Sequence, residues 1–382
     1  MDTPLEKLAT LCRENLGAAE IYQFDLPADA SYEAICARIA TIKIGEDVPT
    51  LFQPNEREDN QPKWTHCVRC HETLPKPGYN ANYHDKCSLE FFGDSKAPYL
   101  AIGNEELSTI ATEQLRRHES LTGVQPKFSA IFKDQRNGLK DLRYIIKPEP
   151  TFSRPWDGVS YKHSSIAELA AMHFAELLEL GVAETALLYL NGEQPALVSK
   201  RFDRKEGRKI HSEDFAQALS ARDKYRGSHE QIANLLKKIS DPRKRERDLE
   251  RFFKVIAFNF LIGNADGHLK KFSIFHKNEE GIPSYSLTPF YDLMPVLLFA
   301  SLDEDQLALT VDGKKRKLQK KHFQALAIKF GISIHELSVF VAEFEANLDF
   351  YYEAFGLFGV PSDFLTAHKI YIEQQLGILK ST

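Results

Sequence analysis

The sequence lacks any apolar run long enough to span a membrane. Its longest apolar stretches are VIAFNFLIG (255–263) and LMPVLLFA (293–300), whereas a membrane helix needs about 20 apolar residues. The opening residues, MDTPLEKLATLCRENLGAAE, carry acidic residues early and contain no apolar core run. We therefore expect neither a secretory signal nor a membrane anchor.

An excess of positive charge is also missing. The 49 Lys and Arg residues are outnumbered by 54 Asp and Glu residues, which gives a formal net charge of −5. The whole molecule therefore has no nucleic-acid footprint, and DNA contact would need a local patch or a partner. With 382 residues, 43% of them hydrophobic and 27% charged, we expect a globular protein of two or three domains.

Cysteine is scarce, and its distribution argues against a disulfide scaffold. Of the five cysteines, Cys67, Cys70 and Cys87 lie close together, while Cys12 and Cys36 stand apart. An odd number with uneven spacing favours a reduced, cytoplasmic protein with a metal site.

The clustered cysteines occur in HCVRCHETLPKPGYNANYHDKCSLEFFG (66–93). Cys67 and Cys70 form a CxxC pair, His84 and Cys87 form an HxxC pair, and thirteen residues lie between the pairs. Two chelating pairs across a Gly- and Pro-containing loop are typical of tetrahedral zinc, and a closed set of four protein ligands indicates a structural role. The alternative is three unrelated thiols.

The remaining pattern predicts four regions and an α+β fold. Alternating and β-rich segments occur at KFSAIF, LRYIIKP and LLYLNGEQPALVSKRF, the last as a hairpin around Asn191 and Gly192, and a helix lies between them and stops at Gly181. Beyond Asp203 the chain is mostly helical. The expected domains are 1–60 as an N-terminal extension, 61–98 as a zinc module, 99–203 as a small β-rich lobe and 204–382 as a large helical lobe. Helices are expected near 5–16, 31–41, 102–119, 164–181, 228–239, 246–262, 319–330, 334–355 and 361–379.

Two acidic residues mark a possible catalytic region. Asp266 and His268 occupy a tight turn in GNADGHLKKFSIF, and Asp292 follows 26 residues later in PFYDLMPV. A base, a metal ligand and a cation are what phosphoryl transfer requires, and Lys147 in YIIKPEP, oriented by Glu168, is the candidate cation. Taken alone, NADG is more often a capped turn.

The segments SLTGVQPKFSA, YIIKP, AELAAMHFAELLELGV, SKRFDR, HSEDFAQALS, LIGNADGH and LTPFYDL together resemble the HipA-like serine/threonine kinases of bacterial toxin–antitoxin systems, including the shorter HipT type. Their order and spacing match over roughly residues 100–350. The resemblance implies a two-lobed kinase fold that uses ATP and Mg²⁺.

The same resemblance implies residue roles. Asp266 would be the catalytic base, Asp292 the magnesium ligand, and Lys147 with Glu168 the phosphate-binding pair. The backbone at Lys200 to Phe202 would read adenine. The loop over ATP would place Gly123, Gln125 and Lys127 near the phosphates.

The stretch SLTGVQPKFSAI (120–131) is neither a GxxxxGK[ST] loop nor a GxGxxG fingerprint, and alone it is a weak signal. In the family context, Ser120 matches a regulatory autophosphorylation position and Thr122 supplies a second hydroxyl. A phosphate on either would occupy or repel the γ-phosphate site and switch the enzyme off. The alternative is that both hydroxyls cap a turn.

One position departs from the family pattern. HLKKF places Lys271 where the family normally carries asparagine, a second magnesium ligand. An ammonium group has no lone pair for a cation, so either one metal suffices, with Lys271 neutralising phosphate, or catalysis is impaired. Lys271→Asn is expected to raise ATP turnover.

Two basic runs remain, 241–254 and 312–321. The first alternates in sign and predicts a solvated helix face. The second is a loop or hairpin that could contact phosphates of tRNA or operator DNA, although exposed lysine-rich loops are common.

The resemblance suggests a protein substrate in translation, such as an aminoacyl-tRNA synthetase, and a helix-turn-helix antitoxin through which operator DNA is contacted. The main alternative is a pseudokinase that serves as a nucleotide-binding or scaffolding subunit. A zinc-finger nucleic-acid binder is disfavoured by the even charge of the zinc module.

Overall fold

The computed structural model describes residues 52–53, 61–100, 127–130, 143–150, 160–190, 194–205, 208–279, 282–299 and 305–381. The helices expected near 5–16, 31–41 and 102–119 lie outside these ranges. So do the loop residues Ser120, Thr122, Gly123 and Gln125.

The first layer is a six-stranded sheet with the order β1-β2-β5-β6-β4-β3. Its strands are β1 (Phe52–Gln53), β2 (Tyr99–Leu100), β3 (Phe128–Ala130), β4 (Tyr144–Pro148), β5 (Thr185–Leu190) and β6 (Gln194–Lys200). β2 and β5 are parallel and the other neighbours are antiparallel. The antiparallel β5–β6 pair confirms the hairpin expected around Asn191 and Gly192, whose turn itself lies outside the described residues.

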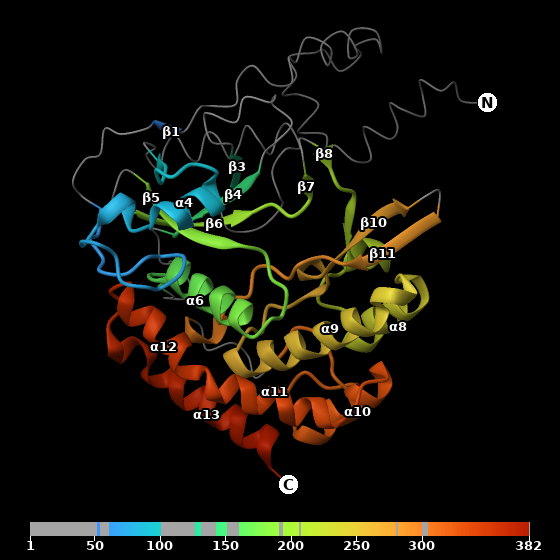
Figure 1. Ribbon diagram of the computed structural model, residues 1–382. Helices are drawn as coiled ribbons and strands as arrows, with labels where there is room; N and C mark the ends of the chain where they lie inside the picture. The colour runs from blue at the N-terminus through green and yellow to red at the C-terminus, as the bar shows by residue number, and fades with distance from the viewer. Residues whose placement is uncertain are drawn as a thin grey trace, which may run out of the picture.

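Helix α6 (Ser164–Leu177) lies between this sheet and helix α12 (Leu348–Leu357) (Figure 1). Twelve of its fourteen residues are buried, as expected for a helix covered on two sides. The predicted end at Gly181 is wrong by four residues. Leu177 is the last helical residue, and the chain then turns through left-handed conformations at Glu179 (φ 53°) and Gly181 (φ 70°). Glycine suits the second position because its left-handed φ strains other residues, and a Cβ atom there would also displace the guanidinium group of Arg251, 2.6 Å away.

The helical part contains a three-stranded antiparallel sheet with the order β11-β10-β9. These strands are β9 (Ser212–Asp214), β10 (Ser273–Glu279) and β11 (Ile282–Leu287), and a short ribbon is formed by β7 (Arg204–Lys205) and β8 (Arg208–Lys209). The helices are α7 (Phe215–Ala218), α8 (His229–Ile239), α9 (Pro242–Ile262), α10 (Lys320–Phe330), α11 (His335–Ala346), α12 and α13 (Thr366–Lys380).

The single helix predicted over 334–355 is two helices. The break falls at Asn347, whose side-chain amide donates to the carbonyl of Glu343 at 2.9 Å. An asparagine side chain that bonds its own backbone competes with the helical ladder, and the hydrophobic spacing on either side does not reveal this. The helix predicted over 361–379 begins instead with a short 3-10 turn, Ser362–Leu365.

Helix α9 supplies the centre of the helical part. Phe252, Phe258 and Phe260 are fully buried along it, and Phe258 contacts Phe174 of α6 and Phe344 of α11. The prediction of a solvated face for 241–254 is wrong at two positions, because Asp241 and Asp248 are buried. Asp241 caps the helix, and the carboxylate of Asp248 accepts the backbone N–H of Leu287 in β11 at 2.9 Å. No helix in the described part of the chain is both long enough and apolar enough to span a membrane.

Candidate active site and metal centre

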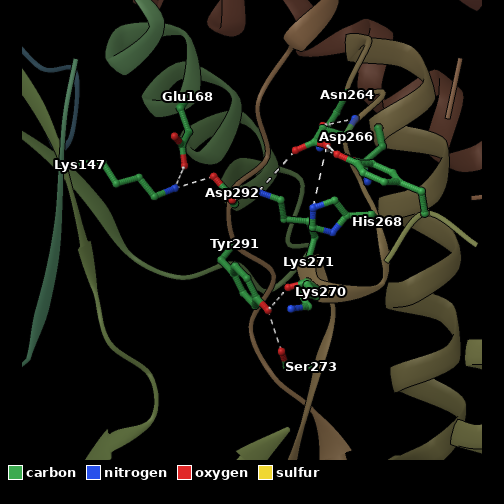
Figure 2. A network of polar contacts seen from close by, with 12 residues as sticks. Lys147, Glu168, Asn264, Asp266, His268, Lys270, Lys271, Ser273, Tyr291 and Asp292 are labelled. Atoms are coloured by element: carbon green, nitrogen blue, oxygen red, sulfur yellow. Dashed lines mark hydrogen bonds and ion pairs between the residues drawn. The ribbon is translucent and has the colours of Figure 1, made fainter. Parts of the chain in front are cut away.

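Lys147 lies near the end of β4, in the interior of the six-stranded sheet, and points toward α6. Its ammonium group is 2.7 Å from Glu168 Oε1 and 2.5 Å from Asp292 Oδ1 (Figure 2). All three side chains are largely buried, with 10%, 6% and 18% of their surfaces exposed. Burial alone would lower the pKa of Lys147, but the carboxylates of Asp292 and Glu168 outweigh it and raise that pKa. The predicted Lys147–Glu168 pair is therefore present.

Asp292 is held between two lysines. It follows β11 in a left-handed conformation (φ 62°), which costs a non-glycine residue about 1–2 kcal/mol. One carboxylate oxygen faces Lys147 and the other contacts the ammonium group of Lys271. Burial would raise the pKa of Asp292, yet the two ammonium groups hold it well below its usual value.

The residue before Asp292 is anchored as well. Tyr291 donates its hydroxyl to the carbonyl of Lys270 at 2.9 Å, so the hydroxyl of Ser273, 2.7 Å away, donates to Tyr291 (Figure 2). These bonds hold the segment after β11 against the start of β10 and the turn that carries Lys271.

The Asp266 turn is fixed by the end of α9. Gly263 ends the helix at φ 74°, and the buried Asn264 donates to the side chain of Asn259 at 3.0 Å. The oxygen of Asn264 accepts the backbone N–H of Asp266 at 3.3 Å. The turn therefore uses Asn264 as a cap, as the sequence allowed, and it also aims Asp266 toward the other charged groups.

Asp266 remains partly accessible, with 37% of its side chain exposed. Lys271 Nζ lies 3.7 Å from its Oδ2 atom, and His268 Nε2 lies 4.0 Å from Oδ1. Burial lowers the pKa of His268 to about 4, which leaves this imidazole neutral at neutral pH. A continuous chain of charges thus runs from Glu168 through Lys147, Asp292 and Lys271 to Asp266 (Figure 2).

Lys127 belongs to the same electrostatic neighbourhood. Burial lowers its pKa to about 8, while Asp292 raises it and Lys147 and Lys271 lower it. Three lysines, one directly before β3, one in β4 and one after the Asp266 turn, therefore surround one carboxylate, Asp292. Such a concentration of cations suits a polyanionic ligand.

The segment expected to read adenine lies beside this cluster. The ring of Phe202 is 5.7 Å from the ring of Tyr291. The N–H groups of Lys200 and Arg201 already donate to the carbonyls of Glu184 and Arg143. An adenine contact at this segment therefore has to come from other backbone groups, and it stays a prediction.

One residue at the site was missed by sequence reasoning. Tyr225 donates its hydroxyl to Asp266 Oδ1 at 2.7 Å, across 41 residues of chain. Lys315, from the second basic run, donates to the carbonyl of Tyr225 at 3.0 Å, and its neighbour Arg316 pairs with Asp305. Part of that run therefore has a role within the molecule. No spacing in the sequence links these three segments.

The four predicted metal ligands also come together. One ligand atom from each of Cys67, Cys70, His84 and Cys87 lies within 4.8 Å of the others. His84 Nδ1 is 3.3 Å from the sulfur of Cys70, and its Nε2 faces the carbonyl of Thr73 at 3.1 Å. That carbonyl fixes the tautomer in which Nδ1 is free to bind a metal.

The chemistry of this donor set fits zinc. Burial raises the pKa values of the Cys70 and Cys87 thiols, and the nearby Cys67 raises them further. Three thiolates so close together need a compensating cation, and three sulfurs with one imidazole nitrogen form a common tetrahedral zinc set.

The chain matches a known protein family and several proteins named as kinases. The model of the HipA-like C-terminal domain family matches residues 119–349, well over half of the chain, so the protein belongs to this family. A Haemophilus influenzae protein named as a candidate kinase is 30% identical over 239 residues, covering 57% of this chain and 64% of its own length. The serine/threonine-protein kinase toxin HipA of Shewanella oneidensis is 29% identical over 222 residues, covering 51% of this chain and 47% of its own.

A solved structure shares the fold. The Shewanella oneidensis toxin–antitoxin complex of HipA, HipB and operator DNA contains a chain that matches with a TM-score of 0.54 and 21% identity, covering 70% of both chains. The mixed helix and sheet fold expected from the HipA resemblance is thus confirmed at this level. The chain spans about half to two thirds of the length of the curated relatives that it matches.

Proposed function

We propose that this chain is an ATP- and magnesium-dependent serine/threonine protein kinase. The observation that carries the proposal is the convergence of Lys147, Asp292 and Asp266 through one unbroken series of ion pairs. These residues come from β4, from the segment after β11 and from the turn after α9. Kinase names among the relatives support the same conclusion at the level of the family.

Each side chain then has a role in transfer. Lys147, held by Glu168, neutralises the phosphates of ATP, and Lys127 adds a second cation. Asp266 accepts the proton of a serine or threonine hydroxyl as that oxygen bonds to the γ-phosphorus. The bond from this phosphorus to the bridging oxygen breaks, and ADP leaves with the negative charge.

Asp292 is the proposed magnesium ligand. Its carboxylate would hold the ion, which would supply positive charge against the negative charge that develops during transfer. Asp292 stays ionised because of its lysine neighbours, so its oxygens can serve as hard ligands for this cation. Tyr225 orients Asp266 through its hydrogen bond, and the neutral ring of His268 lies 4.0 Å from the same carboxylate.

The cysteine and histidine cluster is proposed to hold a structural zinc ion through Cys67, Cys70, His84 and Cys87. Four protein ligands leave no open position for a substrate. Zinc would act here as a crosslink between the segments around residues 67–70 and 84–87.

The proposed substrates are the chain itself and a protein of translation, such as an aminoacyl-tRNA synthetase. Ser120 and Thr122 are the proposed autophosphorylation sites. A helix-turn-helix antitoxin is the proposed partner, in line with the complex of the Shewanella relative, and operator DNA would be contacted through it. The proposed site of action is the cytoplasm.

The test uses the purified chain with labelled ATP and magnesium. Label is expected on Ser120 or Thr122, and Asp266→Ala should reduce its incorporation by at least about a hundredfold, the scale of a lost general base. Asp349→Ala, which removes an exposed carboxylate on α12, is the matched control and should keep full activity. Equal labelling of the wild type and the Asp266→Ala variant would contradict the proposal.

A second candidate function has its own supporting observation. The ammonium group of Lys271 forms ion pairs with both carboxylates proposed for chemistry, Asp292 and Asp266. This arrangement favours a nucleotide-binding scaffold with impaired phosphoryl transfer. ATP binding without any transfer in the same experiment would select this alternative.

A further inference from the structure

Residues 67–71, which we name the zinc knuckle, contain the first two proposed metal ligands and contact helix α6. Arg69, between Cys67 and Cys70, donates two hydrogen bonds to the carboxylate of Glu176, each 2.7 Å long. The pair is two-pronged and partly buried, with 21% of Arg69 and 40% of Glu176 exposed, a geometry that holds position better than a single contact.

The next residue after the ligand pair makes a second contact with α6. His71 Nε2 lies 3.0 Å from His173 Nδ1, and His173 Nε2 lies 3.1 Å from the carbonyl of Thr185 in β5. Burial lowers the pKa of His173 to about 3, so this ring is neutral. Its Nε2–H donates to Thr185, and its Nδ1 accepts from His71.

The backbone of His71 is strained to make these contacts. Its φ is 61°, a left-handed conformation that costs a non-glycine residue of order 1–3 kcal/mol and persists where the surroundings impose it. The ring is also stacked on Phe350 of α12, with centroids 4.8 Å apart and planes 17° apart. The knuckle therefore contacts α6 and α12 directly, and it reaches β5 through His173.

Helix α6 is held at its other end by the strand that carries Lys147. Glu149, one residue beyond β4, accepts the N–H of Ser165 in the first turn of α6 at 3.2 Å. Glu168 lies between this cap and the two contacts with the knuckle at His173 and Glu176. Since the helix rises 1.5 Å per residue, Glu168 is about 12 Å along the axis from Glu176.

We propose that the zinc knuckle is a positioning clamp for the Lys147–Glu168 pair. Zinc fixes the knuckle, Arg69 and His71 then hold α6, and α6 keeps Glu168 against Lys147, so that nucleotide affinity depends on zinc loading. The inference rests on the proposed nucleotide site and adds a coupling between that site and the metal centre.

The test separates the clamp from the metal itself. Arg69→Ala and Glu176→Gln remove the two sides of one contact and leave all four ligands in place. Both variants are expected to retain one zinc per chain, to show faster hydrogen exchange in 164–177, and to bind ATP about fivefold more weakly or worse, the lower end of ordinary coupling between sites. Glu176→Gln preserves the size of the side chain, so it still tests the contact if Arg69→Ala does not fold.

Lys76→Ala is the matched control, because Lys76 is an exposed cation in the loop between the two ligand pairs. It should leave zinc content, exchange in α6 and ATP affinity unchanged. Exchange is measured without nucleotide, so a failure of the kinase proposal would leave this readout intact. Wild-type exchange in α6 of the zinc-loaded Arg69→Ala and Glu176→Gln variants would overturn the clamp, as would a wild-type chain that binds no zinc.

Discussion

The ammonium group of Lys271 contacts Asp292 and lies 3.7 Å from Asp266. One cation therefore neutralises both carboxylates proposed for chemistry. A magnesium ion that binds Asp292 has to displace this group or share the carboxylate with it, and like charges within a few ångströms repel. Lys271 should therefore slow the loading of magnesium-bound ATP.

Lys271→Asn is expected to raise the rate of phosphoryl transfer. The shorter amide leaves Asp292 without the competing charge and offers an oxygen to a metal. An increase of about tenfold, equal to about 1.4 kcal/mol of transition-state stabilisation, is the expected size. Steady-state ATP turnover at varied magnesium concentration measures it.

The control for this variant is Lys270→Asn, because Lys270 is the adjacent lysine and its side chain is exposed. Its turnover should match the wild type. An unchanged or lower rate in Lys271→Asn would show that the ammonium group contributes to phosphate binding more than it obstructs the metal.

Nucleotide binding at the proposed site should depend on pH through Lys127. Burial lowers the pKa of Lys127 to about 8, so this group loses its charge as the pH rises through 8. Bound phosphates favour the charged form and raise the pKa, so binding takes up a proton above pH 8. ATP affinity should therefore fall with rising pH, by at most about tenfold per unit for one proton.

Lys127→Arg provides the matched comparison, since a guanidinium stays charged throughout this range. Its affinity between pH 7 and 9.5, measured by titration calorimetry, should be nearly flat where that of the wild type falls. Parallel curves for the two proteins would exclude Lys127 as the titrating group.

At the scale of elements, hydrophobic periodicity predicted most helices of the described chain, and side-chain hydrogen bonds set their ends. The expected helices over 228–239 and 246–262 correspond to α8 and α9, and α9 begins four residues earlier because Asp241 caps it and Pro242 fits the first turn. The break at Asn347 depends on one amide, which periodicity does not register.

In the candidate site, some residues could be predicted from the sequence and others could not. Asp266, Asp292, Lys147 and Glu168 could be predicted because the family motifs carry them. Tyr225 could not, since its contact with Asp266 depends on how the segment before α8 crosses the turn after α9. The contact of Arg69 with Glu176 joins residues 107 positions apart. Short-range sequence patterns cannot predict a contact between residues so far apart.

At the scale of the whole molecule, the zinc module bridges the sheet and the helical part. Tyr83 is fully buried and exchanges two hydrogen bonds with the backbone of Leu187 in β5. Trp64 contacts both Tyr189 of β5 and Phe358 at the end of α12. A zinc ion at the four proposed ligands would therefore crosslink a module that is packed on both parts of the fold.

Removal of zinc should consequently destabilise the whole chain and not its first segment alone. A loss of about 3 kcal/mol of coordination free energy corresponds to a Tm decrease of roughly 4 °C, because the entropy of unfolding of 382 residues is about 0.8 kcal/mol/K. Cys70→Ser should bind no zinc and show this decrease in scanning calorimetry, and Lys76→Ala, at an exposed position between the two ligand pairs, should keep both the metal and the Tm. Because Trp64 reports from the junction, its fluorescence should change in the same transition as the helical signal. A zinc-free Cys70→Ser chain with the wild-type Tm, or a Trp64 transition well below that of the helices, would show that the module is an independent appendage.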